Sequence, residues 1–259
     1  MTTHHRACNL CEAICGIVIE TAVEDGDERI VSIRGDELDP LSRGHICPKA
    51  VALQDLHTDP DRLKVPLARE GKDWREISWE EAFDRTARRL REVQAEHGRD
   101  SVAVYLGNPT VHNLGSMLFG PPFLRALGSR SRFSATSVDQ LPHHVAAWAM
   151  LGHQLLLPVP DVDRTDFFLV LGANPLASNG SLMTAPGMRR RLREIQARGG
   201  RVVVVDPRRT ETAQRADRHL FIRPGTDALL LAALVGTLFA KDLVRPGRLA
   251  DFTDGWGEL

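Results

Sequence analysis

The chain has 259 residues, of which 42% are hydrophobic and 26% charged, and its formal net charge is −1. This is the composition of an ordinary soluble globular protein with one large or two modest domains, and the near-neutral charge gives no drive toward nucleic acid or an acidic membrane surface. The longest apolar stretch, 228–240, falls short of the ~20 residues that a membrane span needs, so we expect a buried helix there and no membrane span.

The sequence opens with a cysteine pattern that contains every thiol of the chain. Its spacing is C-x2-C-x3-C-x31-C, and a proline follows the last cysteine: Cys8, Cys11, Cys15, Cys47 and Pro48. Three closely spaced thiolates on one loop, joined by a fourth from a distant segment, can supply one sulfur to each iron of a four-iron cubane. A Cys-Pro ending is also familiar from ferredoxins. The pattern therefore indicates a [4Fe-4S] cluster.

Structural zinc and disulfide bonds are the competing interpretations of these cysteines. Zinc sites with four cysteines usually consist of two C-x2-C knuckles, whereas Cys47 stands alone. Disulfides require an oxidising compartment. Residues 1–7 lack the apolar core of a secretory signal and the twin arginine of an export signal, so we expect a cytoplasmic address and reduced thiols.

Residues 1–57 are expected to form a small β-rich domain around the cysteines. The strand-like runs 17–20 and 29–33 flank the turn-rich segment 24–27, which predicts a hairpin. A core of this size is marginal alone, so we expect the cluster to supply part of the domain's stability.

From about residue 76 the pattern changes to alternating helices and strands. Ser78 and Glu81 form a capping box that starts a helix, and Gly98 can end it. Two incomplete α/β domains are predicted, at 58–160 and 161–259. Apolar strands are expected at 101–106, 167–171, 201–205 and 220–222, with a helix at about 186–198.

Continuous apolar strands separated by helices predict an α/β fold with doubly wound, mostly parallel, Rossmann-like sheets. Ligands bind at the carboxyl ends of the strands in such sheets. Thr226 or Asp227 is expected to cap the last helix, whose N-terminus favours anions. Four polar loops follow the four strands and are expected on one rim, as candidate ligand contacts that begin near Gly107, Gly172, Asp206 and Arg223.

These loops contain the residue types of a nucleotide site. Gly172 would let a phosphate approach the backbone, and Asn174 could bond an edge of the ligand. Asp206 stands where an acidic residue accepts ribose hydroxyls or guanine N–H groups, but its separation from the glycine exceeds the usual ~20 residues, which disfavours NAD. Arg208 adds a cation for phosphate. The alternative for each loop is a simple turn.

The cysteine pattern, Lys49 after it, and the segments Gly-Ala-Asn-Pro (172–175) and Val-Asp-Pro-Arg-Arg-Thr (205–210) together resemble the molybdopterin oxidoreductase family. This family includes formate dehydrogenases and nitrate, dimethyl sulfoxide and thiosulfate reductases, and the resemblance covers essentially the whole chain. It implies a bis(molybdopterin guanine dinucleotide) cofactor with molybdenum or tungsten, and an N-terminal [4Fe-4S] cluster that exchanges electrons with it. The family's dinucleotide loops match Gly172, Asn174, Pro175, Ser178, Asn179, Gly180, Asp206, Arg208, Thr210, Gly225, Thr226 and Asp227.

The resemblance also implies roles for Lys49 and Asp139. Lys49 matches the lysine between cluster and pterin, where an ammonium would stabilise the reduced cluster; the alternative is a solvated lysine. In formate dehydrogenases a cysteine or selenocysteine ligand precedes His-Gly-Pro. Here residues 138–142 read Val-Asp-Gln-Leu-Pro, so Asp139 would be the metal ligand, as a carboxylate is in respiratory nitrate reductases. Gln140 in place of the histidine counts against formate as substrate.

Both the ligand role of Asp139 and a catalytic role of the nearby histidines have competing interpretations. Asp139 could instead be the N-cap of the following helix, a position that aspartate favours. His143 or His144 could carry a proton, because imidazole titrates near neutrality, or could simply pack in the core or lie on the surface. We select Asp139, Lys49 and His144 as the catalytic candidates.

Family members are far longer than this chain, so we expect it to be the N-terminal part of such an enzyme. The leading hypothesis is a molybdenum- or tungsten-dependent oxidoreductase that acts on a small molecule. Its redox partner would be a ferredoxin-like protein or a flavin- or NAD-linked subunit. One alternative is a cluster-binding electron-transfer module or an inactive N-terminal fragment, either of which needs a partner chain. Another is a zinc-stabilised nucleotide-binding protein.

Overall fold

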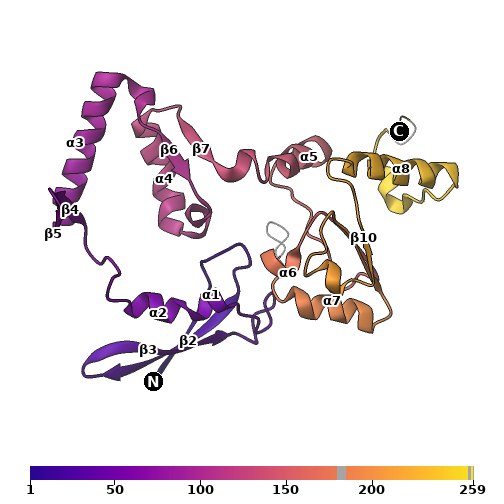
Figure 1. Ribbon diagram of the computed structural model, residues 1–259, viewed down its shortest axis with the longest axis horizontal. Helices are drawn as coiled ribbons and strands as arrows, with labels where there is room; N and C mark the ends of the chain where they lie inside the picture. Colours follow the sequence, from indigo (N-terminus) through magenta and orange to yellow (C-terminus); the bar gives the residue numbers. More distant parts are fainter. Residues whose placement is uncertain (180–184, 256–257, 259) are drawn as a thin grey trace. The chain divides into compact units, whose positions relative to one another are not determined.

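The computed structural model describes residues 1–179, 185–255 and 258, and these residues form a mixed α/β protein (Figure 1). The chain divides into two compact units. One contains Met1–Pro160 and Ser178–Met188, and the other contains Asp161–Ala177 and Arg189–Leu259. An antiparallel N-terminal part is followed by parallel sheets with helices, so the predicted fold class is confirmed.

The N-terminal sheet is antiparallel and has the strand order β1-β2-β3. The predicted hairpin is present as β2 and β3, and its turn holds Asp25 and Gly26 at φ values of 55° and 89°, a left-handed conformation that suits these two residue types. β1 was not predicted, because its residues are polar and almost all exposed at the sheet edge. The strands are β1 (Thr2–Ala7), β2 (Gly16–Glu24) and β3 (Asp27–Gly35).

The loop between β3 and Cys47 is held by backbone contacts that require glycine. A Cβ atom on Gly35 would lie 2.1 Å from the carbonyl oxygen of Gly44. A small shift of the backbone would not make room for a side chain there. Asp39 Oδ1 accepts hydrogen bonds from the backbone N–H and the hydroxyl of Ser42, at 2.6 and 2.8 Å. The buried Ser42 hydroxyl in turn accepts from the Gly16 N–H at 3.1 Å. These bonds tie the loop to the start of β2.

Two short helices and a second hairpin precede the long helix α3. Ser78 accepts a hydrogen bond from the Glu81 N–H at 3.1 Å, and Gly98 follows the last helical residue at φ 87°, so both predicted ends of α3 are confirmed. The Glu81 carboxylate contacts Arg75 and Arg85. The elements are α1 (Pro48–Val51), α2 (Leu53–Thr58), β4 (Leu67–Glu70), β5 (Asp73–Glu76) and α3 (Trp79–His97).

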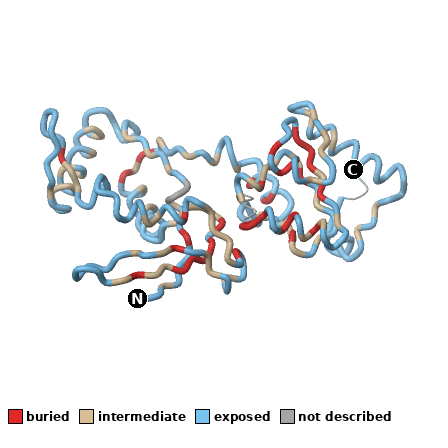
Figure 2. Tube along the Cα trace, turned by 60° about the horizontal axis from the view of Figure 1, so that its bottom comes forward, coloured by how far each residue is buried: buried red, intermediate tan, exposed pale blue. Residues whose placement is uncertain are grey.

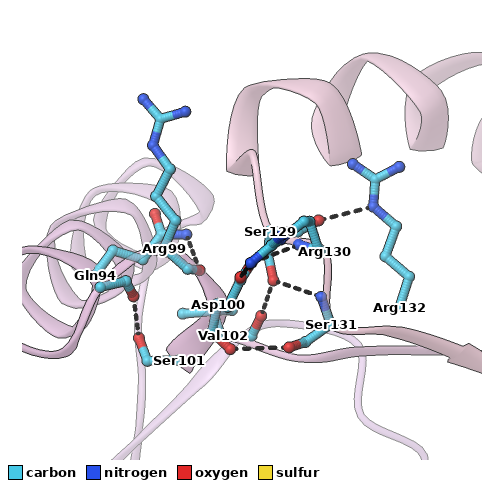
Figure 3. Close-up of polar contacts among 10 residues, drawn as sticks. Gln94, Arg99, Asp100, Ser101, Val102, Ser129, Arg130, Ser131 and Arg132 are labelled. Carbon is cyan, nitrogen blue, oxygen red and sulfur yellow. Dashed lines mark hydrogen bonds and ion pairs between the residues drawn. The ribbon is translucent and has the colours of Figure 1, made fainter.

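β6 (Val104–Leu106) and β7 (Arg132–Ser134) form a two-stranded parallel sheet, with α4 (Leu114–Leu127) between them in sequence. A polar network fixes the amino end of this sheet (Figure 3). Asp100 accepts hydrogen bonds from the N–H and the guanidinium of Arg130, at 2.7 and 2.9 Å. The buried Ser129 hydroxyl donates to the Val102 carbonyl at 2.6 Å. The network joins the segment after α3 to the turn after α4.

The second unit contains a parallel sheet with the order β10-β9-β8. Val202, Val204 and Val205 of β9 are buried with Leu192 and Ile195 of α7, and these residues form the core of this unit. Figure 2 colours the buried residues red. The elements are β8 (Phe167–Leu171), α6 (Pro175–Ser178), α7 (Met188–Ala197), β9 (Arg201–Val205), β10 (Arg218–Leu220) and α8 (Asp227–Ala240).

The four predicted strands were expected to place their loops on one rim, but β6 belongs to a different sheet from the other three. β8, β9 and β10 share a sheet, and their carboxyl-end loops lie on one rim as predicted. β6 pairs instead with β7, a strand that was not predicted because its sequence, Arg-Phe-Ser, is not a run of apolar residues. The loop at Gly107 therefore ends a different sheet from the other three.

Two apolar helices, α5 (Leu141–Leu151) and α8, bury few or none of their residues. α8 is apolar along its length, yet no residue of it is buried, and Figure 2 shows it as exposed or intermediate throughout. The predicted helix is confirmed, but its predicted burial is wrong in this chain. α5 buries only His144 and Ala147. None of the helices in the described part of the chain has the length and apolar character required to cross a membrane.

Candidate cofactor sites

The four cysteines gather at one end of the N-terminal sheet, and all four are free thiols. Cys8 follows β1, Cys11 and Cys15 lie in the loop before β2, and Cys47 is the N-cap residue of α1. The Cys8 N–H donates to the Cys15 carbonyl at 2.8 Å, which closes the loop. Cys8 and Cys15 are part of the apolar core of this domain.

The electrostatic environment shows that the thiols lie within range of one another. Burial first, and then the negative charges of Cys8, Cys11 and Cys47, raise the pKa of Cys15 to about 11. Burial also raises the pKa of Cys8, and the positive charge of Lys49 acts in the opposite direction. The raised pKa values of Cys8 and Cys15 make this a poor site for free thiolates. A bound cation removes the penalty, because a coordinating thiol is deprotonated outright.

The donor set fits a cluster in its chemistry. In the described part of the chain, no group of three or more His, Cys, Asp or Glu side chains is arranged to hold a single metal ion. A four-iron cluster needs one thiolate for each iron rather than convergence on one ion. Lys49 is exposed on α1, and its effect on the pKa of Cys8 places its charge near the thiols.

Asp139 lies in the exposed turn between the short 3-10 helix Ala135–Ser137 and α5. The N-cap residue of α5 is Gln140, and no side chain caps that helix, so the interpretation of Asp139 as the N-cap is wrong. Its exposure leaves the carboxylate accessible, which a ligand role requires. That role stays a prediction.

His144 is buried in α5 and both ring nitrogens have partners. Nδ1 lies 2.8 Å from the Gln154 carbonyl oxygen, and Nε2 lies 3.3 Å from Gln140 Oε1. It borders a cavity of about 350 Å³ between α5 and residues 152–154. These contacts favour a role in holding the segment that carries Asp139, whereas His143 is exposed on the same helix.

In the second unit, the loops after β8 and β9 are joined by hydrogen bonds. The Gly172 N–H donates to the Val205 carbonyl at 2.9 Å and has φ 61°, which continues the β8–β9 pairing into the loop. Asn174 Oδ1 accepts from the Thr212 hydroxyl at 2.7 Å, and its Nδ2 donates to Glu211 at 2.7 Å. Both ends of the Asn174 amide therefore hydrogen-bond the loop after β9, and they join it to the loop after β8.

The loop after β9 presents a carboxylate and a cation. Asp206 is buried, and its Oδ1 accepts from the Arg208 N–H at 2.7 Å, which forms an Asx turn. Arg208 is exposed. Thr210 is buried, and its hydroxyl accepts from the Ala213 N–H at 3.1 Å. Thr210 thus shapes the loop from inside, while Asp206 and Arg208 lie at the rim.

A cavity of about 440 Å³ opens at the carboxyl ends of β9 and β10 beside the start of α8. Its apolar walls and polar groups fit the usual make-up of a small-molecule pocket. Thr226 is the N-cap residue of α8, but its hydroxyl donates to the Arg223 carbonyl at 2.7 Å instead of capping the helix. Gly225 precedes it at φ 81°, and Asp227 is the first helical residue. The lining residues include Val205, Leu220, Phe221, Arg223, Thr226 and Leu230.

The other described residues that were predicted to bind the cofactor lie in or beside α6 and at the end of β6. Pro175 is buried as the first residue of α6, and Ser178 is the last. Asn179 has φ 54°, and its carbonyl accepts from the Ala185 N–H at 2.7 Å. Gly180 lies outside the described residues. Gly107 is the N-cap residue of the 3-10 helix Asn108–His112.

Several residues with a role at these sites were not found from the sequence. The pair Asp39 and Ser42 carries the spacing of a short turn motif, which could have been noticed. Thr212 and Glu211 gave no signal, because their partner Asn174 is about 38 residues away in the sequence.

Comparison with known proteins identifies the family of both parts of the chain. The family model described as the molybdopterin oxidoreductase Fe4S4 domain matches residues 1–57. The model described as molybdopterin oxidoreductase matches residues 62–244. The four cysteines, including Cys47, all lie within the first match, and the loops after β8, β9 and β10 lie within the second.

Relatives extend over nearly all of this chain, which spans about a third of their length. It is 28% identical to a nitrate reductase of Symbiobacterium thermophilum, with 100% of this chain and 34% of the relative covered. It is 27% identical to the molybdopterin-containing subunit of thiosulfate reductase from Salmonella typhimurium, with 97% and 32% covered.

Among solved structures, acetylene hydratase from Pelobacter acetylenicus matches with a TM-score of 0.68 and 25% identity over 92% of this chain and 32% of that protein. Two relatives are named as reductases and one as a hydratase, so the shared fold does not fix the reaction. The family itself is shown: this chain belongs to the molybdopterin oxidoreductases and carries their Fe4S4 domain at its N-terminus.

Proposed function

We propose that this chain is the cluster-bearing and dinucleotide-binding part of a molybdenum- or tungsten-dependent oxidoreductase. The observation that carries the proposal is the gathering of four free thiols within the segment that matches the Fe4S4 family model. Cys8, Cys11, Cys15 and Cys47 would each hold one iron of a [4Fe-4S] cluster, which would pass single electrons.

Lys49 and Asp139 are proposed to act nearest the redox centres. Lys49 would stabilise the reduced cluster, since burial raises the pKa of Cys8 and the positive charge of Lys49 opposes that rise. Asp139 would offer a carboxylate oxygen as metal ligand, which suits a high-valent metal ion. His144, with Gln140 and Gln154 as partners, would hold the Asp139 segment in place.

The second unit is proposed to bind guanine dinucleotide through the rim of β8, β9 and β10. Asp206 would accept N–H or O–H donors of the nucleotide, and Arg208 would pair with phosphate. The backbone at Gly172 and the cavity beside Thr226 provide space for the ligand. The bis form of the cofactor, the choice of metal, the substrate, a separate redox partner and a cytoplasmic address remain part of this proposal.

The dinucleotide role is tested by counting guanine nucleotide and iron in the same preparations. We expect guanine nucleotide in acid-treated wild-type protein, and its loss without loss of iron in Asp206→Ala. Thr253→Ala is the control, since Thr253 lies outside the rim loops, and should keep both. Equal loss of iron and nucleotide in Asp206→Ala would show that Asp206 acts through folding, and absence of nucleotide from the wild type would contradict the role.

A second candidate function is a cluster-binding electron-transfer module that requires another polypeptide. The exposed, apolar α8 favours it, because a helix that is apolar all round is normally buried. For this function, we expect the purified protein to contain an intact cluster and no guanine nucleotide.

A further inference from the structure

We propose that Glu211 is a specificity-determining residue of the nucleotide site, and that Thr212 and Asn174 are the residues that position it. The inference rests on the proposed dinucleotide function and adds to it a second carboxylate, five residues after Asp206. The chemistry it would recognise is a pair of adjacent hydrogen-bond donors, such as the edge of guanine or a ribose diol.

Thr212 joins the two rim loops through a buried hydroxyl. Its Oγ1 donates to Asn174 Oδ1 at 2.7 Å and accepts from the Leu176 N–H at 3.2 Å. The Thr212 N–H donates to the same Asn174 oxygen at 3.3 Å. Thr212 is fully buried, so loss of this hydroxyl would leave buried polar groups unpaired.

These bonds fix the orientation of the Asn174 side-chain amide. With Oδ1 directed at Thr212, Nδ2 points to Glu211 and donates to its Oε2 at 2.7 Å. The Glu211 side chain is thereby held at one position although it is exposed. An ionised carboxylate has about four acceptor positions, so the bond from Asn174 leaves capacity for ligand donors.

The surroundings keep Glu211 ionised. Its pKa is lowered by a hydrogen bond from its own backbone N–H, then by Asn174, and also by the positive charge of Arg208. Arg208 thus lies within electrostatic range of Glu211, and the Arg208 N–H also contacts Asp206. One loop therefore presents two carboxylates for donors and one guanidinium for phosphate, a charge pattern that matches a nucleoside diphosphate.

The test measures binding of GDP, inosine diphosphate and 2′,3′-dideoxy-GDP to the purified chain by calorimetry. Inosine diphosphate lacks the exocyclic amine, and the dideoxy compound lacks the ribose diol. We expect Glu211→Gln to weaken GDP binding on the order of tenfold, because a charge-assisted hydrogen bond is lost. We also expect this variant to lose the preference for GDP over one analogue, which identifies the edge that is read.

Matched variants separate positioning from charge. Glu194→Gln makes the same chemical change on α7, away from the rim, and should bind like the wild type. Thr212→Val removes the hydroxyl and should reduce the preference for GDP, whereas Thr212→Ser keeps the hydroxyl and should restore it. If Thr212→Val does not fold, the comparison of Glu211→Gln with Glu194→Gln still tests whether Glu211 recognises the nucleotide.

Three results would overturn the inference in distinguishable ways. Unchanged affinity and preference in Glu211→Gln would remove its role while leaving the proposed function intact. Equal weakening for all three nucleotides would show a general charge effect and no specificity. No binding of GDP to the wild type would contradict the dinucleotide function and, with it, this role of Glu211.

Discussion

The N-terminal cysteine domain and helix α8 use apolar residues in opposite ways. The small N-terminal domain buries Ile17, Ile33 and Ala50 together with two of its cysteines. Helix α8 is far richer in leucine, yet Leu234 and Leu238 remain 42% and 43% exposed. Apolar content alone therefore does not make a core. The N-terminal apolar residues bury two thiols, whereas the described part of the chain buries no residue of α8.

Loss of one cysteine is expected to have the largest effect on the N-terminal side of this comparison. Cys11→Ala or Cys47→Ala removes one of four iron ligands, so we expect the brown chromophore and the iron to be lost. The N-terminal domain should also become less stable, because metal binding free energy is folding free energy in small metal domains. Absorption spectra and iron assays check this, and retention of both iron and colour would contradict the cluster assignment.

A matched pair of leucines compares a formed core with α8 directly. Leu192→Ala, at 1% exposure, should lower the free energy of unfolding by about 2–5 kcal/mol. Leu238→Ala, at 43% exposure, should change it by less than about 0.5 kcal/mol. Urea unfolding measures both. A large effect at Leu238 would show that α8 is covered in solution, by a second copy or another polypeptide.

Sequence patterns predicted those elements whose signals are local. The turn at Asp25 and Gly26, the cap at Ser78 and the apolar run of β9 each depend on neighbouring residues, and all three are confirmed. β1 and β7 were missed, because neither Thr2–Ala7 nor Arg132–Ser134 contains a run of apolar residues. The pairing of β6 could not be predicted, since sheet membership depends on contacts between distant segments.

The candidate site shows the same division. The cysteine spacing indicated a shared site before the structure placed the thiols within range of one another. The partners of Asn174 were not predictable, because the amide bonds residues 37 and 38 positions away. The sequence pattern indicated a ligand contact at Asn174, whereas in the structure its amide hydrogen-bonds Glu211 and Thr212 of the neighbouring loop.

The loop that carries Cys47 offers a smaller test of how tightly the N-terminal domain is built. A Cβ on Gly35 would meet the Gly44 carbonyl at 2.1 Å, so Gly35→Ala should destabilise the domain by about 1–3 kcal/mol. Gly71→Ala is not a neutral control because of its φ of 66°. Gly236→Ala is the comparison, because no atom lies near its Cβ position, and inside α8 alanine should raise the stability by up to about 1 kcal/mol. Thermal unfolding distinguishes them, and equal melting temperatures would contradict the close approach.

Acid stability is expected to show the smallest effect. The pKa of Asp39 is lowered, first by the hydrogen bond from the Ser42 N–H. Because the folded-state pKa lies below the unfolded value of about 3.8, the stabilisation is present above that pH and is lost as the pH falls through the folded pKa. Asp39→Asn should therefore reduce the loss of stability in acid. Urea midpoints measured across this range check it, and an unchanged pH profile would argue against this hydrogen bond.

The central claim is that the four thiols hold an iron–sulfur cluster and that the chain binds a molybdenum or tungsten cofactor. Elemental analysis and an absorption spectrum of anaerobically purified protein test it most directly. The account predicts about four irons per chain together with molybdenum or tungsten. Iron without either metal would limit the function to a cluster-binding module, and zinc without iron would contradict the claim.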